Sequence, residues 1–399
     1  MSGEADIIAR TERYSARNYN PLPVVIERGK GVWVWDSEGR KYLDCLSAYS
    51  ALNQGHCHPR ILAALQDQAQ RVTITSRAFH NARMGPFLEK LCQLSNMDMA
   101  LPMNTGAEAV ETAIKAVRKW GYSVKGVTDN AAEIIVCTQN FHGRTITAVS
   151  ASSEHDYRAN FGPLTPGFVW VPHGDAAALE AAITENTVAF MVEPIQGEGG
   201  ILIPPDGYLS EARRICRKNG VLFVLDEIQT GLGRCGTLYC YQHEADAWPD
   251  LLIVGKALGG GVYPVSAVLG RREVLGVFQP GDHGSTFGGN PLASAVGEAA
   301  LDVILEEGLA ERSRELGAYL LAELRGINTV KVEEIRGRGL FIGVEIRKEA
   351  GPARPFCESL MALGILTKET HEQVIRLAPP LIIDKAELDF VVAQFRKLL

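Results

Sequence analysis

The sequence predicts an α/β fold, built around a mostly parallel sheet with helices on both faces. Four short, mainly apolar runs recur along the chain with helical stretches between them, at residues 133–137, 188–192, 221–225 and 251–254. The runs do not alternate with polar residues, which is typical of strands buried on both faces of a parallel sheet. Ligands bind such sheets at the carboxyl ends of the strands, so the residues that follow these runs are the first candidates for a functional site.

The two ends of the chain carry different patterns. Residues 31–42 alternate around a Ser-Glu-Gly turn and predict a hairpin. Residues 301–324 predict a helix, and residues 339–346 predict a strand. We therefore expect a large central domain flanked by a smaller α+β domain, with boundaries at 50–297 for the first and at 1–49 and 298–399 for the second.

Composition narrows the class of protein. A chain of 399 residues is long enough for two or three domains at roughly 150 residues each. The formal net charge of −7 argues against a nucleic-acid-binding surface, which needs clustered Lys and Arg. No apolar run reaches the roughly 18 residues that a membrane span requires, and the first ten residues are typical of neither a signal nor a transit peptide. We expect a cytoplasmic protein that binds small molecules.

The eight cysteines are scattered along the chain and predict free thiols. Two clusters, residues 56–58 and Cys235, Cys240 with His243, combine metal-ligand residue types. Neither has the paired spacing of a zinc site, so we expect no metal.

Residues 105–108 fit the Thr-x-x-Glu capping box at the start of an amphipathic helix. The free backbone amides there, beside Gly106, could bind a phosphate. On this motif alone an ordinary helix start is the better explanation.

Asp226 and Lys256 each follow one of the apolar runs. A carboxylate at the edge of a dry core needs a cationic partner, and a protonated pyridine nitrogen is one such partner. A partly desolvated lysine has a lowered pKa and could form a Schiff base. A structural salt bridge for Asp226 and a lysine that extends to solvent explain the same residues equally well.

Two glycine-containing segments superficially match nucleotide-binding motifs. Residues 231–236 match GxGxxG but open no periodic helix, so a nicotinamide site is disfavoured. Gly255-Lys256 lacks both the first glycine and the Ser or Thr of a P-loop. Phe141 could stack on a planar cofactor, although plain packing is the better explanation of this residue taken alone.

Taken together, the motifs resemble those of the class III, fold-type I pyridoxal-phosphate (PLP) aminotransferases, and most closely those that act on ornithine. The resemblance runs from Asn18 to Pro380. Its motifs lie at residues 18–21, 47–56, 104–108, 141–144, 192–198, 225–231, 255–257, 285–291 and 376–380.

The resemblance implies a role for each matching cofactor residue. Lys256 would carry the cofactor and move the substrate proton, and Asp226 would hold the pyridine nitrogen. Gln229 would bond the ring hydroxyl, with Phe141 and Ile228 on the two ring faces. The amides of Gly106 and Ala107 would bind the phosphate. Thr286 would reach the same phosphate from a partner subunit, so that a homodimer would be the minimum active unit.

The resemblance also implies the substrates, ornithine and 2-oxoglutarate, and a ping-pong transfer that yields glutamate and glutamate semialdehyde, which cyclises to pyrroline-5-carboxylate. Arg144 would pair with the carboxylate of ornithine, and Tyr19 would seat its α-amine, with Tyr49 beside them. Arg376 would bind 2-oxoglutarate, and Glu198 would neutralise Arg376 while ornithine is bound. Relatives that act on acetylornithine or 4-aminobutyrate are the nearest alternative. A nicotinamide oxidoreductase and a non-catalytic binding protein are the alternatives from other classes.

Overall fold

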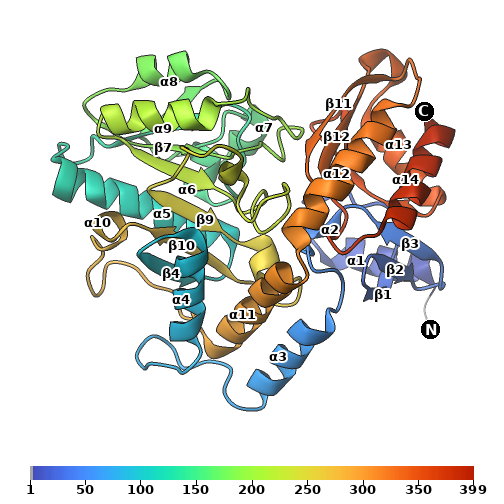
Figure 1. Cartoon of the computed structure of the whole chain (residues 1–399), viewed down its shortest axis with the longest axis horizontal. Coiled ribbons are helices and arrows are strands. Elements are labelled where there is room, and N and C mark those ends of the chain that lie inside the picture. Colours follow the sequence, from blue (N-terminus) through green and yellow to red (C-terminus); the bar gives the residue numbers. More distant parts are fainter. Residues whose placement is uncertain (1–2) are drawn as a thin grey trace.

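A seven-stranded sheet forms the centre of the computed structural model, which describes residues 3–399 (Figure 1). In spatial order its strands are β4 (Met99–Met103), β10 (Ser266–Gly270), β9 (Leu251–Val254), β8 (Leu222–Asp226), β7 (Thr187–Val192), β5 (Glu133–Cys137) and β6 (Phe168–Val171). Only β10 runs antiparallel to its neighbours, and the other six strands share one direction. The predicted α/β class with a mostly parallel sheet is confirmed.

The four predicted strands are all present in this sheet. β5 and β9 have the predicted bounds, whereas β7 and β8 are each displaced by one residue at one or both ends. β7, β8 and β9 are buried throughout because the sheet is covered on both sides. Their continuous apolar character therefore reflects their burial, as the sequence indicated.

Adjacent residues of one strand belong to two different cores, one on each face of the sheet. Ile134 of β5 packs with α5 (Gly106–Trp120), whereas Ile135 belongs to the core that contains residues of α9 (Tyr208–Lys218) and α11 (Pro291–Glu306). The remaining helices of this part of the chain are α3 (Pro59–Ala69), α4 (Met84–Ser95), α6 (Ile146–Ser150), α7 (His155–Arg158), α8 (Ala176–Ala182) and α10 (Arg272–Leu275).

Two smaller sheets lie to one side of the large one (Figure 1). The first contains β1 (Ile26–Lys30), β2 (Trp33–Asp36), β3 (Lys41–Asp44) and β13 (Ile365–Leu366), and the second contains β11 (Val332–Arg338), β12 (Phe341–Ile346), β15 (Val374–Leu377) and β14 (Lys368–Thr370). β2 and β3 pair as the predicted hairpin. Because β13 pairs with β3, segments from the two ends of the chain share one sheet. Helices α1 (Glu4–Tyr14), α13 (Ala353–Ala362) and α14 (Lys385–Leu398) lie in these end segments.

The predicted helix over residues 301–324 was wrong as a single element. The chain forms α11, which ends at Glu306, and then α12 (Leu309–Arg325). Gly308 separates them with a φ of 60°, a left-handed conformation that a right-handed helix cannot contain and that glycine adopts readily. The strand predicted over 339–346 begins only at Phe341, because Gly339 also has a positive φ in the turn from β11.

Membrane-spanning helices, disulfides and clusters of metal-ligand side chains were sought in residues 3–399. No helix within residues 3–399 is both long and apolar enough to cross a membrane. The eight cysteines form no disulfide. Residues 3–399 contain no group of three or more His, Cys, Asp or Glu side chains that could hold a metal ion.

Candidate active site

The carboxyl ends of five strands of the large sheet meet around one cavity of about 140 Å³. β4, β5, β7, β8 and β9 all run in the same direction, so the residues that follow them come to one edge. The cavity is lined by Gly106, Ala107, Phe141, His142, Gly143, Glu193, Asp226, Ile228, Gln229, Thr230 and Lys256. Seven of the predicted cofactor residues are in this lining, although they are spread over 150 residues of sequence.

Lys256 follows β9 and Gly255 and begins a short 3-10 helix that ends at Gly259. Its φ of 44° places it in the left-handed region, where a residue with a side chain is rare and often functional. Burial lowers the pKa of its amine, and this outweighs the opposing effect of the Glu198 carboxylate. A lowered pKa increases the fraction of unprotonated amine, which is the nucleophilic form.

Asp226 ends β8 with its side chain buried and bonded on both oxygens. Its Oδ2 lies 2.7 Å from His142 Nδ1, and its Oδ1 accepts the backbone N–H of Ile228 at 3.1 Å. Burial alone would lower the pKa of His142, but the hydrogen bond to Asp226 and the charge of that carboxylate raise it. The pair therefore holds a carboxylate in a fixed orientation at the cavity wall.

Glu193 follows β7 by one residue and is also buried. Its Oε2 accepts the backbone N–H of Phe141 at 2.9 Å, which ties the loop after β5 to the end of β7. Burial raises the pKa of Glu193 to about 7. The sequence interpretation gave neither Glu193 nor His142 a role, although both lie in motifs that it recognised, and a buried polar residue directly after an apolar strand was the available signal.

We predict that Glu193→Gln stabilises the cofactor-free protein at pH 8 relative to the wild type, and does so much less at pH 5. A carboxyl group whose pKa is raised on folding contributes stability below its unfolded pKa of about 4.5 and loses that contribution as the pH rises through 7. Glutamine carries no charge and can still accept the Phe141 N–H. Melting temperatures of both proteins between pH 5 and pH 8 test this, and an equal difference at both pH values would contradict it.

The N-terminus of α5 faces the cavity with Gly106 and Ala107 as its first residues. The predicted capping box is present, since Thr105 Oγ1 accepts the N–H of Glu108 at 3.2 Å and Glu108 Oε2 accepts the N–H of Thr105 at 2.8 Å. A Cβ on Gly106 would come within 3.1 Å of Ile228, so glycine keeps this wall of the cavity open. Helix N-termini of this kind favour anions.

Arg376 of β15 and Glu198 form a bidentate ion pair beside the cavity, in which Arg376 is buried and the Glu198 side chain is 23% exposed. Arg376 Nη1 and Nη2 lie 2.7 and 2.9 Å from the two oxygens of Glu198, and Arg376 is 1% exposed. Burial would raise the pKa of Glu198, but the charge and hydrogen bonds of Arg376 lower it to about 2. The guanidinium lies 5.3 Å from the ring centroid of Tyr49.

Gln229 connects this ion pair to the cavity. Its Nε2 lies 3.5 Å from Glu198 Oε1 and 3.4 Å from the backbone oxygen of Tyr49. A Cβ on Gly197 would come within 1.7 Å of Gln229 Oε1, so only glycine leaves room for the amide there. The packing requirement on Gly197 was not evident from the sequence.

Arg144 lies on the aromatic side chains at the cavity mouth. Its guanidinium carbon is 3.8 Å from the ring centroid of Tyr157 and 5.2 Å from that of Phe141. It is exposed, and no carboxylate of residues 3–399 lies within 4 Å of its guanidinium. An exposed, unneutralised arginine held by aromatic rings is suited to bind a substrate carboxylate.

Six predicted site residues are absent from the lining of this cavity: Tyr49, Arg144, Glu198 and Arg376, described above, and also Tyr19 and Thr286. Tyr19 is 72% exposed and lines a separate cavity of about 340 Å³ with Tyr49. Thr286 is exposed in the loop before α11. Both would need a neighbouring group, substrate or subunit, to complete a site.

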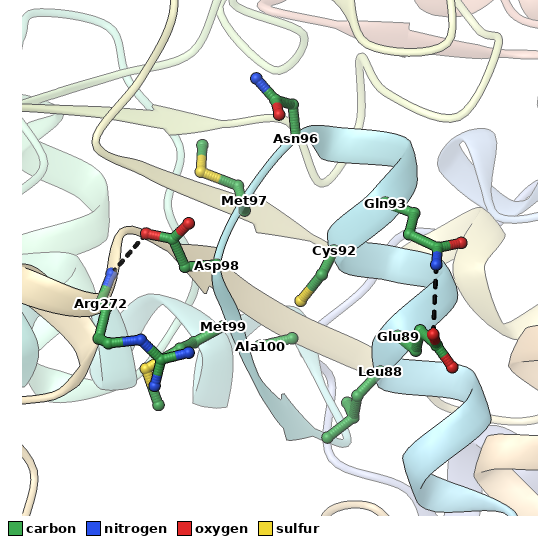
Figure 2. A pocket seen from close by; sticks show the side chains of 10 residues that line it. All are labelled: Leu88, Glu89, Cys92, Gln93, Asn96, Met97, Asp98, Met99, Ala100 and Arg272. Carbon is green, nitrogen blue, oxygen red and sulfur yellow. Dashed lines mark hydrogen bonds between the residues drawn. The ribbon is translucent and has the colours of Figure 1, made fainter.

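A larger hollow of about 590 Å³ lies between α4 and the start of β4 (Figure 2). Two hydrogen bonds join residues of its lining: the backbone N–H of Arg272 donates to Asp98 Oδ2 at 3.0 Å, and Gln93 Nε2 donates to Glu89 Oε1 at 3.3 Å. None of the predicted site residues lines it, and we assign it no chemistry. Residues 231–236, the GxGxxG match, form turns and are followed by no long helix.

A partly buried lysine, a carboxylate on the neighbouring strand and a helix N-terminus at one sheet edge define a class of enzyme. The model of the family "Aminotransferase class-III" matches residues 14–399, and the chain belongs to this family of PLP-dependent aminotransferases. This match confirms the family resemblance that was inferred from the motifs. The predicted fold-type I architecture is confirmed as well.

Individual members of the family, known from their sequences or solved structures, are similar to the chain over nearly its whole length. The chain is 60% identical over 392 residues to an ornithine aminotransferase of Halalkalibacterium halodurans, with 98% of each chain covered. The ornithine aminotransferase of Toxoplasma gondii, whose structure shows partial occupancy of PLP at the active site, matches with a TM-score of 0.97 and 47% identity over 99% of this chain and 93% of that one. An acetylornithine aminotransferase of Elizabethkingia anophelis matches with a TM-score of 0.90 and 46% identity over 100% and 99%.

Proposed function

We propose that the chain is an ornithine δ-aminotransferase, which transfers the terminal amine of L-ornithine to 2-oxoglutarate and yields glutamate 5-semialdehyde and glutamate. Relatives of that activity at about 60% identity over nearly the whole chain support the assignment. The observation that carries it is the ion pair of Glu198 and Arg376 beside Lys256.

The ion pair accounts for two substrates of different shape. Ornithine presents a terminal amine, so no carboxylate lies next to the reacting carbon, and Arg376 stays neutralised by Glu198. 2-Oxoglutarate presents a carboxylate next to its keto group, and Arg376 can bind it in bidentate fashion once Glu198 moves away. Arg144, which has no carboxylate partner in residues 3–399, would bind the distant carboxylate of ornithine, and Tyr19 would seat its α-amine.

The residues around the cavity fit PLP. The N-terminus of α5 offers amides to a phosphate, the buried Asp226 offers a carboxylate to the pyridine nitrogen, and Lys256 offers an amine of lowered pKa. Gln229 would bond the ring hydroxyl, with Phe141 and Ile228 against the two faces of the ring. When bound, PLP supplies a carbonyl that condenses with amines and a ring that accepts electrons.

Protein groups carry out the proton transfers. Lys256 Nζ would take the proton from the carbon that bears the reacting amine, because its lowered pKa leaves it able to act as a base. Asp226, fixed by His142 and the Ile228 amide, would keep its charge toward the pyridine nitrogen.

We also propose that two subunits form the active unit. Thr286 is exposed and outside the cavity of its own chain, which agrees with a role at the phosphate of a partner subunit. Within each chain, residues 50–297 would form the cofactor domain, and residues 1–49 with 298–399 would form the second domain. The pairing of β3 with β13 supports this division.

Rates on three amine donors test the substrate assignment. We expect the purified holoenzyme to transfer the amine of ornithine faster than those of N-acetylornithine and 4-aminobutyrate, measured as initial kcat/KM with 2-oxoglutarate as acceptor. A clear preference for either of the other donors would replace the assignment with that activity.

We predict that Glu198→Gln shifts selectivity from ornithine toward glutamate by about tenfold to a hundredfold in the ratio of kcat/KM values. This corresponds to about 1.4–2.7 kcal/mol, a part of the roughly 3–5 kcal/mol that leaving a buried charge without its partner costs. The neutral amide leaves Arg376 unneutralised, which favours a carboxylate beside the reacting carbon. Single-turnover rates with each amine measure the ratio. Glu211→Gln, which removes an exposed ion pair with Arg214, serves as the control, and an unchanged ratio in Glu198→Gln would refute the role.

A further inference from the structure

Residues Ser47–Ser50 form one turn of left-handed helix, labelled α2 (Figure 1). Their φ values are 51°, 47°, 61° and 70°, and none of them is glycine. The backbone N–H of Ala51 donates to Ser47 O at 2.8 Å, and that of Ser50 donates to Leu46 O at 3.3 Å. L-residues visit this conformation as single residues, so four in succession are a strained arrangement that the surroundings must enforce.

Buried polar contacts fix both ends of the turn. Before it, Asp44 Oδ1 accepts the N–H groups of Leu46 and Ser47, each at 2.9 Å, while Asp44 Oδ2 lies 2.7 Å from His56 Nε2. After it, Gln54 Nε2 donates to the carbonyl of Ala257 at 2.9 Å, next to Lys256. The turn is therefore held between the N-terminal sheet and the segment that carries the reactive lysine.

The turn directs Tyr49 toward the site and Ala48 away from it. The carbonyl of Tyr49 lies 3.4 Å from Gln229 Nε2, and its ring lies 5.3 Å from the Arg376 guanidinium. Ala48 is exposed and lines the cavity of about 340 Å³ outside the Lys256 site. A right-handed turn would direct the carbonyl and the ring of Tyr49 away from Gln229 and Arg376, because the handedness of a turn sets the direction of each side chain relative to the backbone.

We propose that the left-handed turn Ser47–Ser50, held by Asp44, is a positioning element that keeps the Tyr49 ring over the Glu198–Arg376 pair and so maintains the preference for ornithine. This role of the turn rests on the proposed function. The Tyr49 ring covers the buried guanidinium of Arg376, whereas the Glu198 side chain is 23% exposed, so a carboxylate has to displace Glu198 to reach Arg376. A displaced Tyr49 would leave the pair solvated and easier to open.

Two substitutions at Ala48 test the proposal, because a side chain there has space in the outer cavity. Glycine adopts a positive φ without strain, whereas β-branched valine at a positive φ is a genuine outlier. We expect Ala48→Gly to keep the wild-type ratio of kcat/KM for ornithine over glutamate. We expect Ala48→Val to lower that ratio about tenfold or more, as small displacements of site residues can.

Binding of glutarate to the holoenzyme, measured by calorimetry, gives a readout independent of turnover. Glutarate has two carboxylates and no reactive amine or keto group, so it reports how readily Arg376 becomes available. We expect Ala48→Val to bind glutarate more tightly than Ala48→Gly. Equal ratios and equal glutarate affinities in the two variants would overturn the proposal, even if Ala48→Val melts at a lower temperature.

A second pair of variants covers the case in which Ala48→Val does not fold. Asp44→Asn keeps an oxygen that can accept the N–H groups of Leu46 and Ser47, and Asp44→Ala removes it. We expect the ratio to fall in Asp44→Ala and to be retained in Asp44→Asn, and the same ratio in both would overturn the proposal. Wild-type enzyme that does not use ornithine would refute the proposed function instead.

Discussion

Replacing Lys256 with alanine is expected to lower the rate of amine transfer by more than about a thousandfold, because loss of a positioned general base alone costs roughly 10²–10⁴ in rate. Lys256 is the only lysine in the cavity lining of the described chain, and burial lowers the pKa of its amine. Alanine removes both the attachment point of the cofactor and the group that moves the proton. Glutamate formation from ornithine and 2-oxoglutarate measures the loss.

Two further measurements complete this test. Borohydride reduction of the wild-type holoenzyme should leave the pyridoxyl group on the peptide that contains Lys256, as mapped by mass spectrometry. Lys30→Ala, which removes an exposed lysine of β1, should retain the wild-type rate. A modified lysine elsewhere, or a Lys256→Ala enzyme with near-normal turnover, would remove the basis of the proposed mechanism.

Asp226→Asn is expected to have the next largest effect, a loss of about a thousandfold in turnover, comparable to removing a preorganised electrostatic group from an active site. Asparagine has nearly the same shape and can keep the 3.1 Å contact with the Ile228 N–H. It carries no charge, so it cannot keep a pyridine nitrogen protonated. Turnover under saturating PLP and the dissociation constant for PLP should both change, with weaker binding in the variant.

Asp206→Asn is the matched control, because Asp206 is an exposed aspartate that contacts Arg338 at the surface. It should leave turnover and PLP affinity unchanged. Melting curves of the Asp226 variant separate loss of charge from loss of fold. If Asp226→Asn kept most of its activity while remaining folded, the pairing of this carboxylate with the cofactor would be excluded.

The sequence predicted four strands of the large sheet, β5, β7, β8 and β9, because burial on both faces demands continuous apolar residues, and it did not predict β4, β6 and β10. β5 and β9 were predicted with their observed bounds. It failed at the α11–α12 boundary, where a single glycine with a positive φ interrupts a pattern that is otherwise helical on both sides. The hydrophobic periodicity of a window of about 11–18 residues does not show a break of one residue between two helices.

Local sequence also could not show the partners that distant segments supply. The pairing of His142 with Asp226 and the contact of Glu193 with the Phe141 amide join residues across the fold, and the left-handed turn at Ser47–Ser50 is next to Gln54, which bonds to the distant Ala257. Each depends on where strand ends and loops meet in space. Their residue types alone are compatible with ordinary loops.

The sequence by itself determined the α/β class, the enzyme family and the set of side chains at the strand ends. These follow from burial patterns and motifs, which are properties of short segments. Only the tertiary structure showed that Asp226 is paired with His142 and that Arg144 lies on aromatic rings, and it gave the bidentate geometry of the Glu198–Arg376 pair, which the resemblance had implied. Charge pairing depends on distances of a few ångströms between remote residues, and folding alone sets those distances.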